Sequence, residues 1–148
     1  MSKGKINLKL LGRSLEDLKT ISAYLQDSIV ILNDVIFLEK NKIFILLVSR
    51  FMWEDAEKGL FRENKRIKCV LKFNQVSKVL SKNIDQKNKK KFLELLTIET
   101  VTMENQNFKI NLIFAGDNVI TIFVEEIDVL MDDLGDPWVV KKAPKHKI

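Results

Sequence analysis

The sequence predicts an α+β fold built mainly on an antiparallel sheet, which could also curl into a split barrel such as that of pleckstrin-homology-like domains. About eight strand-like segments are joined by short links, which favours antiparallel neighbours over parallel βαβ units. Only two segments have the spacing of a substantial helix, one near each end. The 148 residues, 46% of them hydrophobic, suffice for one core. We expect a single domain over residues 1–140, with an N-terminal helix and a C-terminal capping helix, and a basic, flexible tail over 141–148.

The N-terminal segment predicts a strand followed by a helix. Residues 5–11 have the composition of a strand, which Gly12 ends. Ser14 is a typical N-cap residue, and Asp17 three positions later completes a capping-box arrangement. Apolar residues then recur at helical spacing, so we expect a helix over residues 15–26.

Three strand-like segments follow this helix, over residues 29–32, 35–40 and 43–50. They are separated by two-residue links, Asn33-Asp34 and Asn41-Lys42. Because Asn tolerates positive φ, both links are suited to hairpin turns.

The middle of the chain predicts a short helical turn and then an alternating strand. The turn covers residues 52–58 and is closed by Gly59. From Arg66 to Asn74 apolar and polar residues alternate, which predicts a half-buried strand with a basic outer face. Residues 76–80 are expected to continue this strand after a bend.

The next segments are less regular. Residues 85–91 are polar and fit a helix or a loop, while residues 92–101 fit a helix at their start and a strand at their end. Residues 107–114 and 119–124 predict a hairpin around the intervening Ala-Gly-Asp-Asn turn.

The last predicted element is the capping helix. Apolar residues lie at i, i+3, i+4 and i+7 from Ile127, which is the stripe of an amphipathic helix. Gly135 suits the position after the helix end, and Pro137 lies just beyond it.

Charge is distributed unevenly along the chain. The net charge is +5, but residues 65–91 hold ten basic side chains against Asp85, and residues 110–140 hold seven acidic ones and no base. A basic block can bind a phosphate backbone, or it can be an ordinary solvated face. Only four of the 25 basic residues are Arg, the side chain that most specific phosphate contacts use. The candidate nucleic-acid-binding residues of this block are Lys78, Lys82, Lys87, Lys89, Lys90 and Lys91.

Known catalytic patterns are absent from the sequence. His146, the single histidine, lies in the Lys-rich tail, and Cys69 lies on the apolar face of a predicted strand. The five glycines form no phosphate-binding loop. The acidic residues Asp132, Asp133 and Asp136 either hold a weak divalent cation or are simply solvated. We therefore predict no catalytic residues, no metal ligands and no cofactor.

A cluster of aromatic and basic residues at the end of the strand predicted over residues 43–50 is the best candidate for a contact surface. Arg beside Trp is common in binding hot spots, although core packing with the Arg over a ring explains the cluster equally well. We predict partner-binding residues in this cluster and in the basic strand that follows it: Arg50, Trp53, Arg66, Lys68 and Lys72.

Three segments resemble, in the same order, those of an uncharacterised family of small alphaproteobacterial proteins that is catalogued as a domain of unknown function. They are Ile21–Asp27, Arg50–Glu54 and Asp133–Trp138, and the resemblance covers residues 8–144. It implies a single domain and shares a basic region after the Trp-Glu pair, but it brings no activity, cofactor or substrate. Members of the family are rich in Arg and Ala, where this chain is rich in Lys and Asn.

Taken together, these features favour a cytoplasmic, non-enzymatic binding or adaptor domain for a protein partner. A single Cys69 fits a reducing compartment, and no apolar stretch approaches the ~20 residues of a membrane span. The first alternative is a nucleic-acid-binding or ribosome-associated protein, and the second is an enzyme that uses carboxylates and a divalent metal. The protein is expected to be a monomer or a homodimer, since the basic block could pair with the acidic segment of a second copy or of its own chain.

Overall fold

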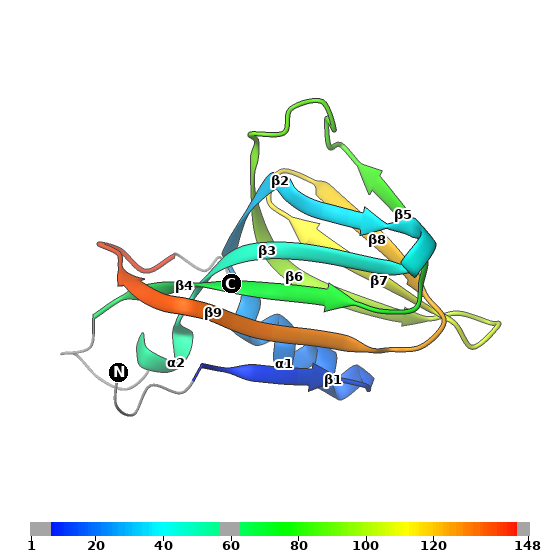
Figure 1. Ribbon diagram of the computed structural model, residues 1–148, viewed down its shortest axis with the longest axis horizontal. Helices are drawn as coiled ribbons and strands as arrows, with labels where there is room; N and C mark the ends of the chain where they lie inside the picture. Colours follow the sequence, from blue (N-terminus) through cyan, green and yellow to red (C-terminus); the bar gives the residue numbers. More distant parts are fainter. Residues whose placement is uncertain (1–6, 57–62, 145–148) are drawn as a thin grey trace.

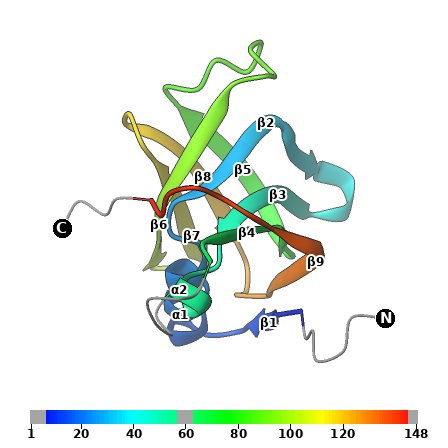
Figure 2. The same ribbon diagram turned by 90° about the vertical axis from the view of Figure 1, so that its left-hand side faces the viewer.

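The computed structural model describes residues 7–56 and 63–144, and in it nine strands form one antiparallel sheet. The strand order is β1-β9-β4-β3-β2-β6-β7-β8-β5, and the sheet curls without closing (Figures 1 and 2). The strands are β1 Lys9–Gly12, β2 Ser28–Leu38, β3 Ile43–Phe51, β4 Lys65–Phe73, β5 Val76–Lys82, β6 Phe92–Thr102, β7 Phe108–Phe114, β8 Asn118–Val124 and β9 Val129–Val139. The predicted antiparallel sheet is confirmed.

The first helix, α1 (Leu15–Leu25), forms where the sequence predicts it. The Ser14 side chain accepts a hydrogen bond from the Asp17 backbone N–H, and the Asp17 carboxylate accepts one from the Arg13 N–H. The helix buries its apolar stripe against the concave side of the sheet, close to β6 and β1. Figure 1 shows it beneath the curled sheet, next to β1.

Strand β2 is one long strand, so the hairpin predicted at Asn33-Asp34 is wrong. Its pairing with β3 shifts between Val30 and Val35, which bends the strand at that point. The backbone N–H groups of Leu32 and Asn33 donate to carbonyl oxygens of the β5–β6 loop. These long-range bonds hold an Asn-Asp pair in a strand although its residue types favour a turn.

The other two predicted hairpins form, but the link between β2 and β3 is longer than the predicted Asn41-Lys42 pair, and Lys42 rather than Asn41 has a positive φ. A single 3₁₀ turn, η1 (Glu39–Asn41), and Lys42 in the left-handed conformation join β2 to β3. Gly116 and Asp117 both have positive φ in the three-residue turn between β7 and β8, which suits the conformational freedom of Gly and Asp. Helix α2 (Trp53–Ala56) is the predicted short helical turn, while its expected end at Gly59 lies outside the described residues.

Strand β5 does not continue β4, contrary to the prediction. Gln75 has a φ of 60°, and after this bend the chain crosses to pair with β8 at the opposite end of the sheet order. Residues 85–91 form a loop, and the ambiguous segment 92–101 belongs to strand β6.

The predicted C-terminal capping helix is wrong, because the same residues form strand β9. Val129, Met131 and Asp133 face inward, whereas Leu130 and Asp132 between them face outward. An acidic residue at an inward position breaks the apolar alternation that marks a strand and leaves a helix-like spacing instead. Strand β9 lies between β1 and β4, so it completes the sheet rather than capping it.

The core lies inside the curl of the sheet, where the inward side chains of the strands meet α1. Phe44 packs between Phe37 and Phe73, with ring centroids 6.4 Å away on each side. No helix of the described part of the chain is long and apolar enough to cross a membrane.

Candidate interaction surface

Arg50 sits at the centre of a buried ion cluster that ties β3 to α2 and β9. Its Nε donates to Asp133 Oδ1 at 2.8 Å, and its Nη2 donates to Asp133 Oδ2 at 2.7 Å. The other side of the guanidinium contacts Glu54, with Nη1 2.9 Å from Oε1 and Nη2 2.7 Å from Oε2. Since the Arg50 side chain is 0% exposed, its role is to hold these elements together.

This cluster keeps its charges and does not activate a nucleophile. Burial disfavours the charged guanidinium, but hydrogen bonds to Asp133 and Glu54 outweigh that effect and raise the pKa of Arg50. Cys69 is buried on β4, as its alternating strand predicts. Burial, reinforced by the negative charge of Asp133, raises the pKa of its thiol, which therefore stays protonated at neutral pH.

Trp53 and Arg66 form a corner next to the ion cluster. The Trp53 indole Nε1 donates to the Gln26 carbonyl at 2.9 Å, and its ring meets the edge of Phe51 with centroids 4.5 Å apart. Arg66 Nη1 donates to the Ser49 carbonyl at 2.8 Å, and its Cζ lies 5.9 Å from the centre of the Phe51 ring. Burial lowers the pKa of Arg66, although Asp27 and Glu94 oppose this effect.

The predicted lysines fall into two groups on different parts of the surface. Lys68 and Lys72 lie half-buried on the outward face of β4. The second group is separated from β4 by β3, β2, β6, β7 and β8 in the sheet order, and Figure 1 shows β3 and β2 between β4 and β5. The second group lies on β5 and on the loop that follows it, and comprises Lys78, Lys82, Lys87, Lys89, Lys90 and Lys91.

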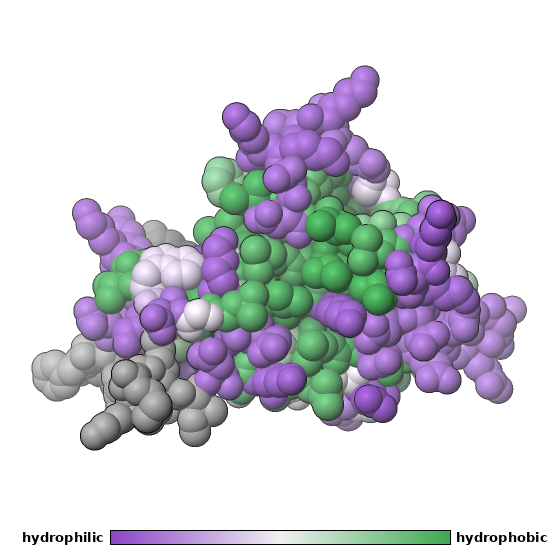
Figure 3. All heavy atoms as spheres, in the orientation of Figure 1, coloured by the Kyte–Doolittle hydropathy of each residue, from purple (hydrophilic) through white to green (hydrophobic). Residues whose placement is uncertain are grey.

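The outward side of β1, β9, β4, β3 and β2 is unusually apolar, and we call it the outer face. Lys72 is in register with Leu130 on one side and Ile45 on the other. The same row continues to Leu11 on β1 and Ile36 on β2, whose side chains are 59% and 51% exposed. Figure 3 shows hydrophobic side chains over the middle of this side of the molecule, with hydrophilic ones around them. The apolar members of the outer face are Leu11, Ile29, Ile36, Leu38, Ile43, Ile45, Leu47, Val70, Leu130 and Leu134.

Sequence reasoning missed the outer face, although one signal for it was present. Residues 43–48 are an uninterrupted apolar run within a single strand. A strand that faces water on one side alternates apolar and polar residues, so a continuous run indicates that both sides of β3 contact other groups.

The structure separates most of the acidic residues that could have formed a metal site. Asp132 faces outward and Asp133 faces inward from the same strand, and Asp133 is engaged with Arg50. No group of three His, Cys, Asp or Glu side chains within residues 7–56 and 63–144 is arranged to hold a metal ion. His146 lies outside the described residues.

The basic strand and the acidic segment pair within one chain. Strand β9, which carries Asp132 and Asp133, is the neighbour of β4, which carries Lys68 and Lys72. This strand pairing places part of the acidic segment beside the basic strand within one chain.

Comparison with known proteins gives one match. The family model described as "Protein of unknown function (DUF2948)" matches residues 8–146, nearly the full length of the chain. No curated protein and no solved structure matches it.

Proposed function

We propose that this chain, which belongs to the DUF2948 family of proteins of unknown function, is a non-enzymatic, cytoplasmic domain that binds another protein through its outer face. The observation that carries the proposal is the set of apolar side chains on the outward side of five adjacent strands, where Leu11 and Ile36 are more than half exposed. Contiguous exposed apolar patches on soluble proteins mark interaction sites, whereas single exposed apolar residues are ordinary.

The charges on this face suggest what the partner surface is like. Lys68 and Lys72 lie among the apolar residues of the outer face, and Lys9 and Asp132 are paired in register near its edge. An apolar partner surface with carboxylates opposite Lys68 and Lys72 would cover the face without leaving these two charges unpaired. The proposed partner is therefore a protein whose contact patch is mainly apolar and carries carboxylates opposite Lys68 and Lys72.

The sequence-predicted contact residues divide between direct and indirect roles in this proposal. Lys68 and Lys72 belong to the contact itself. Arg50 is buried, so it acts by holding α2 and β9 in place at the margin of the face. Trp53 and Arg66 extend that margin, since each is only partly buried.

The test compares charge insertion on the outer face with charge insertion elsewhere. Binding partners are captured by cross-linking to the wild type, to an Ile36→Glu/Ile45→Glu variant and to a Val101→Glu variant. Val101→Glu is the control, because Val101 is an exposed valine on β6 outside the outer face. Each captured protein is then purified and titrated by calorimetry. We expect the face variant to lose the partner and the control to retain it. Equal affinity of all three proteins for the partner would exclude the outer face.

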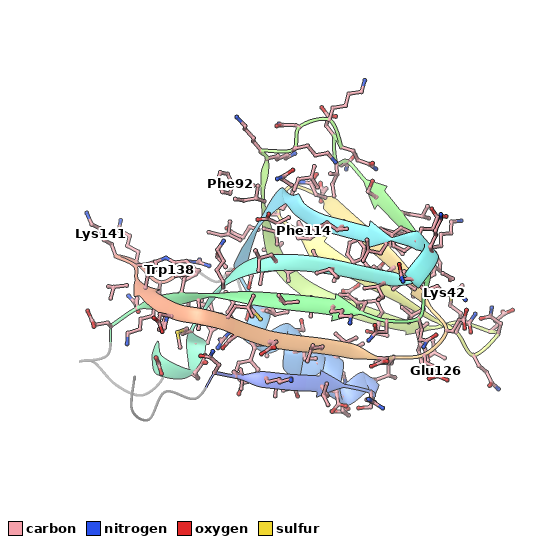
Figure 4. The ribbon with its side chains drawn as sticks, in the orientation of Figure 1. Lys42, Phe92, Phe114, Glu126, Trp138 and Lys141 are labelled. Carbon is pink, nitrogen blue, oxygen red and sulfur yellow. The ribbon has the colours of Figure 1, made fainter. Side chains whose placement is uncertain are left out.

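A second candidate function, nucleic-acid binding, is favoured by one side chain. Phe92 begins β6 directly after Lys89, Lys90 and Lys91, and it is 66% exposed. Figure 4 shows it projecting from the end of the strand. An exposed aromatic ring beside several cations is the arrangement that stacks a base while the cations contact phosphates.

Fluorescence anisotropy with labelled single-stranded RNA and duplex DNA tests this second candidate. Binding should fall steeply with salt, and Phe92→Ala should weaken RNA binding by about fivefold or more, as expected for one lost stacking contact. Lys109→Gln, on β7, is the control for a general loss of positive charge. No binding at low salt would remove this function.

A further inference from the structure

Outside the surfaces described above, an open-sided cavity of about 250 Å³ lies between β2 and β5. It lies where the curled sheet fails to close. Strand β5 is the last strand in the sheet order, and residues 35–38 of β2 pair with β3 alone. Two strand edges therefore face each other across the cavity, and Figure 1 shows β5 beside β2.

Backbone hydrogen bonds bound the opening at both ends. At one end the Val76 N–H donates to the Lys42 carbonyl at 2.9 Å. At the other end the Leu32 N–H donates to the Lys91 carbonyl at 2.9 Å, and the Asn33 N–H donates to the Lys89 carbonyl at 2.8 Å. These hydrogen bonds would block the path of an extended peptide that paired with the edge of β2 or of β5. The cavity thus suits a small molecule rather than an added strand.

The cavity is apolar within and polar at its rim. Its inner wall includes Phe44 and Ile120, which belong to the core, and Phe37, which is partly buried against it. The rim includes Gln86, which donates to the Ser81 hydroxyl at 3.0 Å, and the exposed Lys89. Small-molecule sites commonly combine an apolar lining with a few polar groups that fix the orientation of the ligand.

The electrostatic surroundings select the charge of that ligand. The segment over residues 78–91 carries six lysines against Asp85. Such a cluster raises the local concentration of anions, and Lys89 is the cation that lies at the cavity itself.

The volume limits the size of the ligand. A cavity of about 250 Å³ holds about eight groups of the size of a water molecule, at ~30 Å³ each. We propose that the cavity binds a medium-chain carboxylate of about six to eight carbon atoms, with the hydrocarbon chain against Phe37, Phe44 and Ile120 and the carboxylate at Lys89. This site is separate from the outer face, so either proposal can fail without the other.

The test uses octanoate as the probe, with octan-1-ol and octylamine as chain-matched neutral and cationic compounds. Binding to the full chain is followed by amide chemical shifts and calorimetry. We expect octanoate to shift amides of β2 and β5 and to bind at least threefold more tightly than octan-1-ol, with octylamine weakest. The Lys89→Gln variant should lose three- to tenfold in octanoate affinity and keep its affinity for octan-1-ol.

Two further variants make the test specific. Lys82→Gln removes a neighbouring lysine that does not line the cavity, and it should change octanoate affinity by less than twofold. Ser81→Trp places a large ring at the rim from an exposed position, and it should abolish binding of octanoate and octan-1-ol without unfolding the protein. Unchanged binding in Ser81→Trp, or shifts confined to the outer face, would overturn the site. Equal affinities for octanoate and octylamine would overturn the role of Lys89.

Discussion

Replacing Asp133 with alanine would leave the buried Arg50 guanidinium with only Glu54 as a carboxylate partner. Asp133 accepts two of the four hydrogen bonds that the guanidinium makes to carboxylates. Each charge-assisted hydrogen bond is worth about 1.5–3 kcal/mol, and removing one partner of a buried ion pair typically costs about 3–5 kcal/mol. Because Glu54 still balances the charge, we expect a loss near the lower limit, about 3 kcal/mol.

The assay is urea unfolding followed by circular dichroism, which gives the free energy of unfolding from the midpoint and the slope. Asp132→Ala is the matched control, since Asp132 is the outward-facing neighbour on the same strand and should change stability by less than about 0.5 kcal/mol. The double variant Arg50→Met/Asp133→Leu replaces the pair with apolar groups and should regain most of the loss. Glu54 is part-exposed and can turn to water in that variant.

Two results would refute this reasoning. If Asp133→Ala and Asp132→Ala were equally mild, the ion cluster would not stabilise the fold. If the double variant were no more stable than Asp133→Ala, the loss would come from the shape of the site rather than from an unpaired charge.

Three further effects follow from the structure. Because burial raises the pKa of Cys69, the thiol ionises above about pH 9 in the unfolded protein but not in the folded one. The free energy of unfolding should therefore fall by up to ~1.4 kcal/mol per pH unit above that pH. Unfolding of Cys69→Ala measured at about pH 8–10 should show a weaker dependence on pH. Gly12→Ala should cost about 1–3 kcal/mol in thermal unfolding, because the new Cβ would lie 2.9 Å from Ile21 Cδ1 and force α1 away from β1. Ser14→Ala should cost about 1 kcal/mol in the same assay, since it removes the cap on the Asp17 N–H, and Ser14→Asp should restore it.

Each of these effects has an outcome that contradicts it. A pH dependence that is identical in wild type and Cys69→Ala would mean that the thiol titrates alike in both states. A neutral Gly12→Ala would mean that Ile21 can change rotamer at no cost. Equal stability of the Ser14 variants would mean that solvent caps the helix as well as the hydroxyl does.

Local patterns predicted the elements whose determinants are close together in sequence. Helix α1 has its cap, its first-turn acid and its apolar stripe within twelve residues, from Ser14 to Leu25. The β7–β8 hairpin likewise carries its turn chemistry between two regular apolar segments.

The errors have a common physical cause, which is pairing between distant residues. Arg50 and Asp133 both occupy inward strand positions. Each charged side chain is tolerated there because it pairs with the other, which is 83 positions away in the sequence. In the sequence alone, Asp133 interrupts the apolar alternation of β9 and leaves the apolar spacing of a helix. The Asn33-Asp34 pair predicts a turn for a similar reason. The residue that keeps Asn33 in a strand, by accepting its backbone N–H, lies in the distant β5–β6 loop.

The position of β9 in the sheet has a consequence for how the protein is made. The last strand in sequence, β9, lies between β1 and β4, so residues 129–139 must leave the ribosome before either neighbour can pair on that side. At ~5–20 residues synthesised per second, one edge of β4 stays unpaired and Arg50 lacks Asp133 for seconds. The fold is therefore completed only after the final strand emerges, and chains that stop before Val129 are expected to need chaperones or to be degraded.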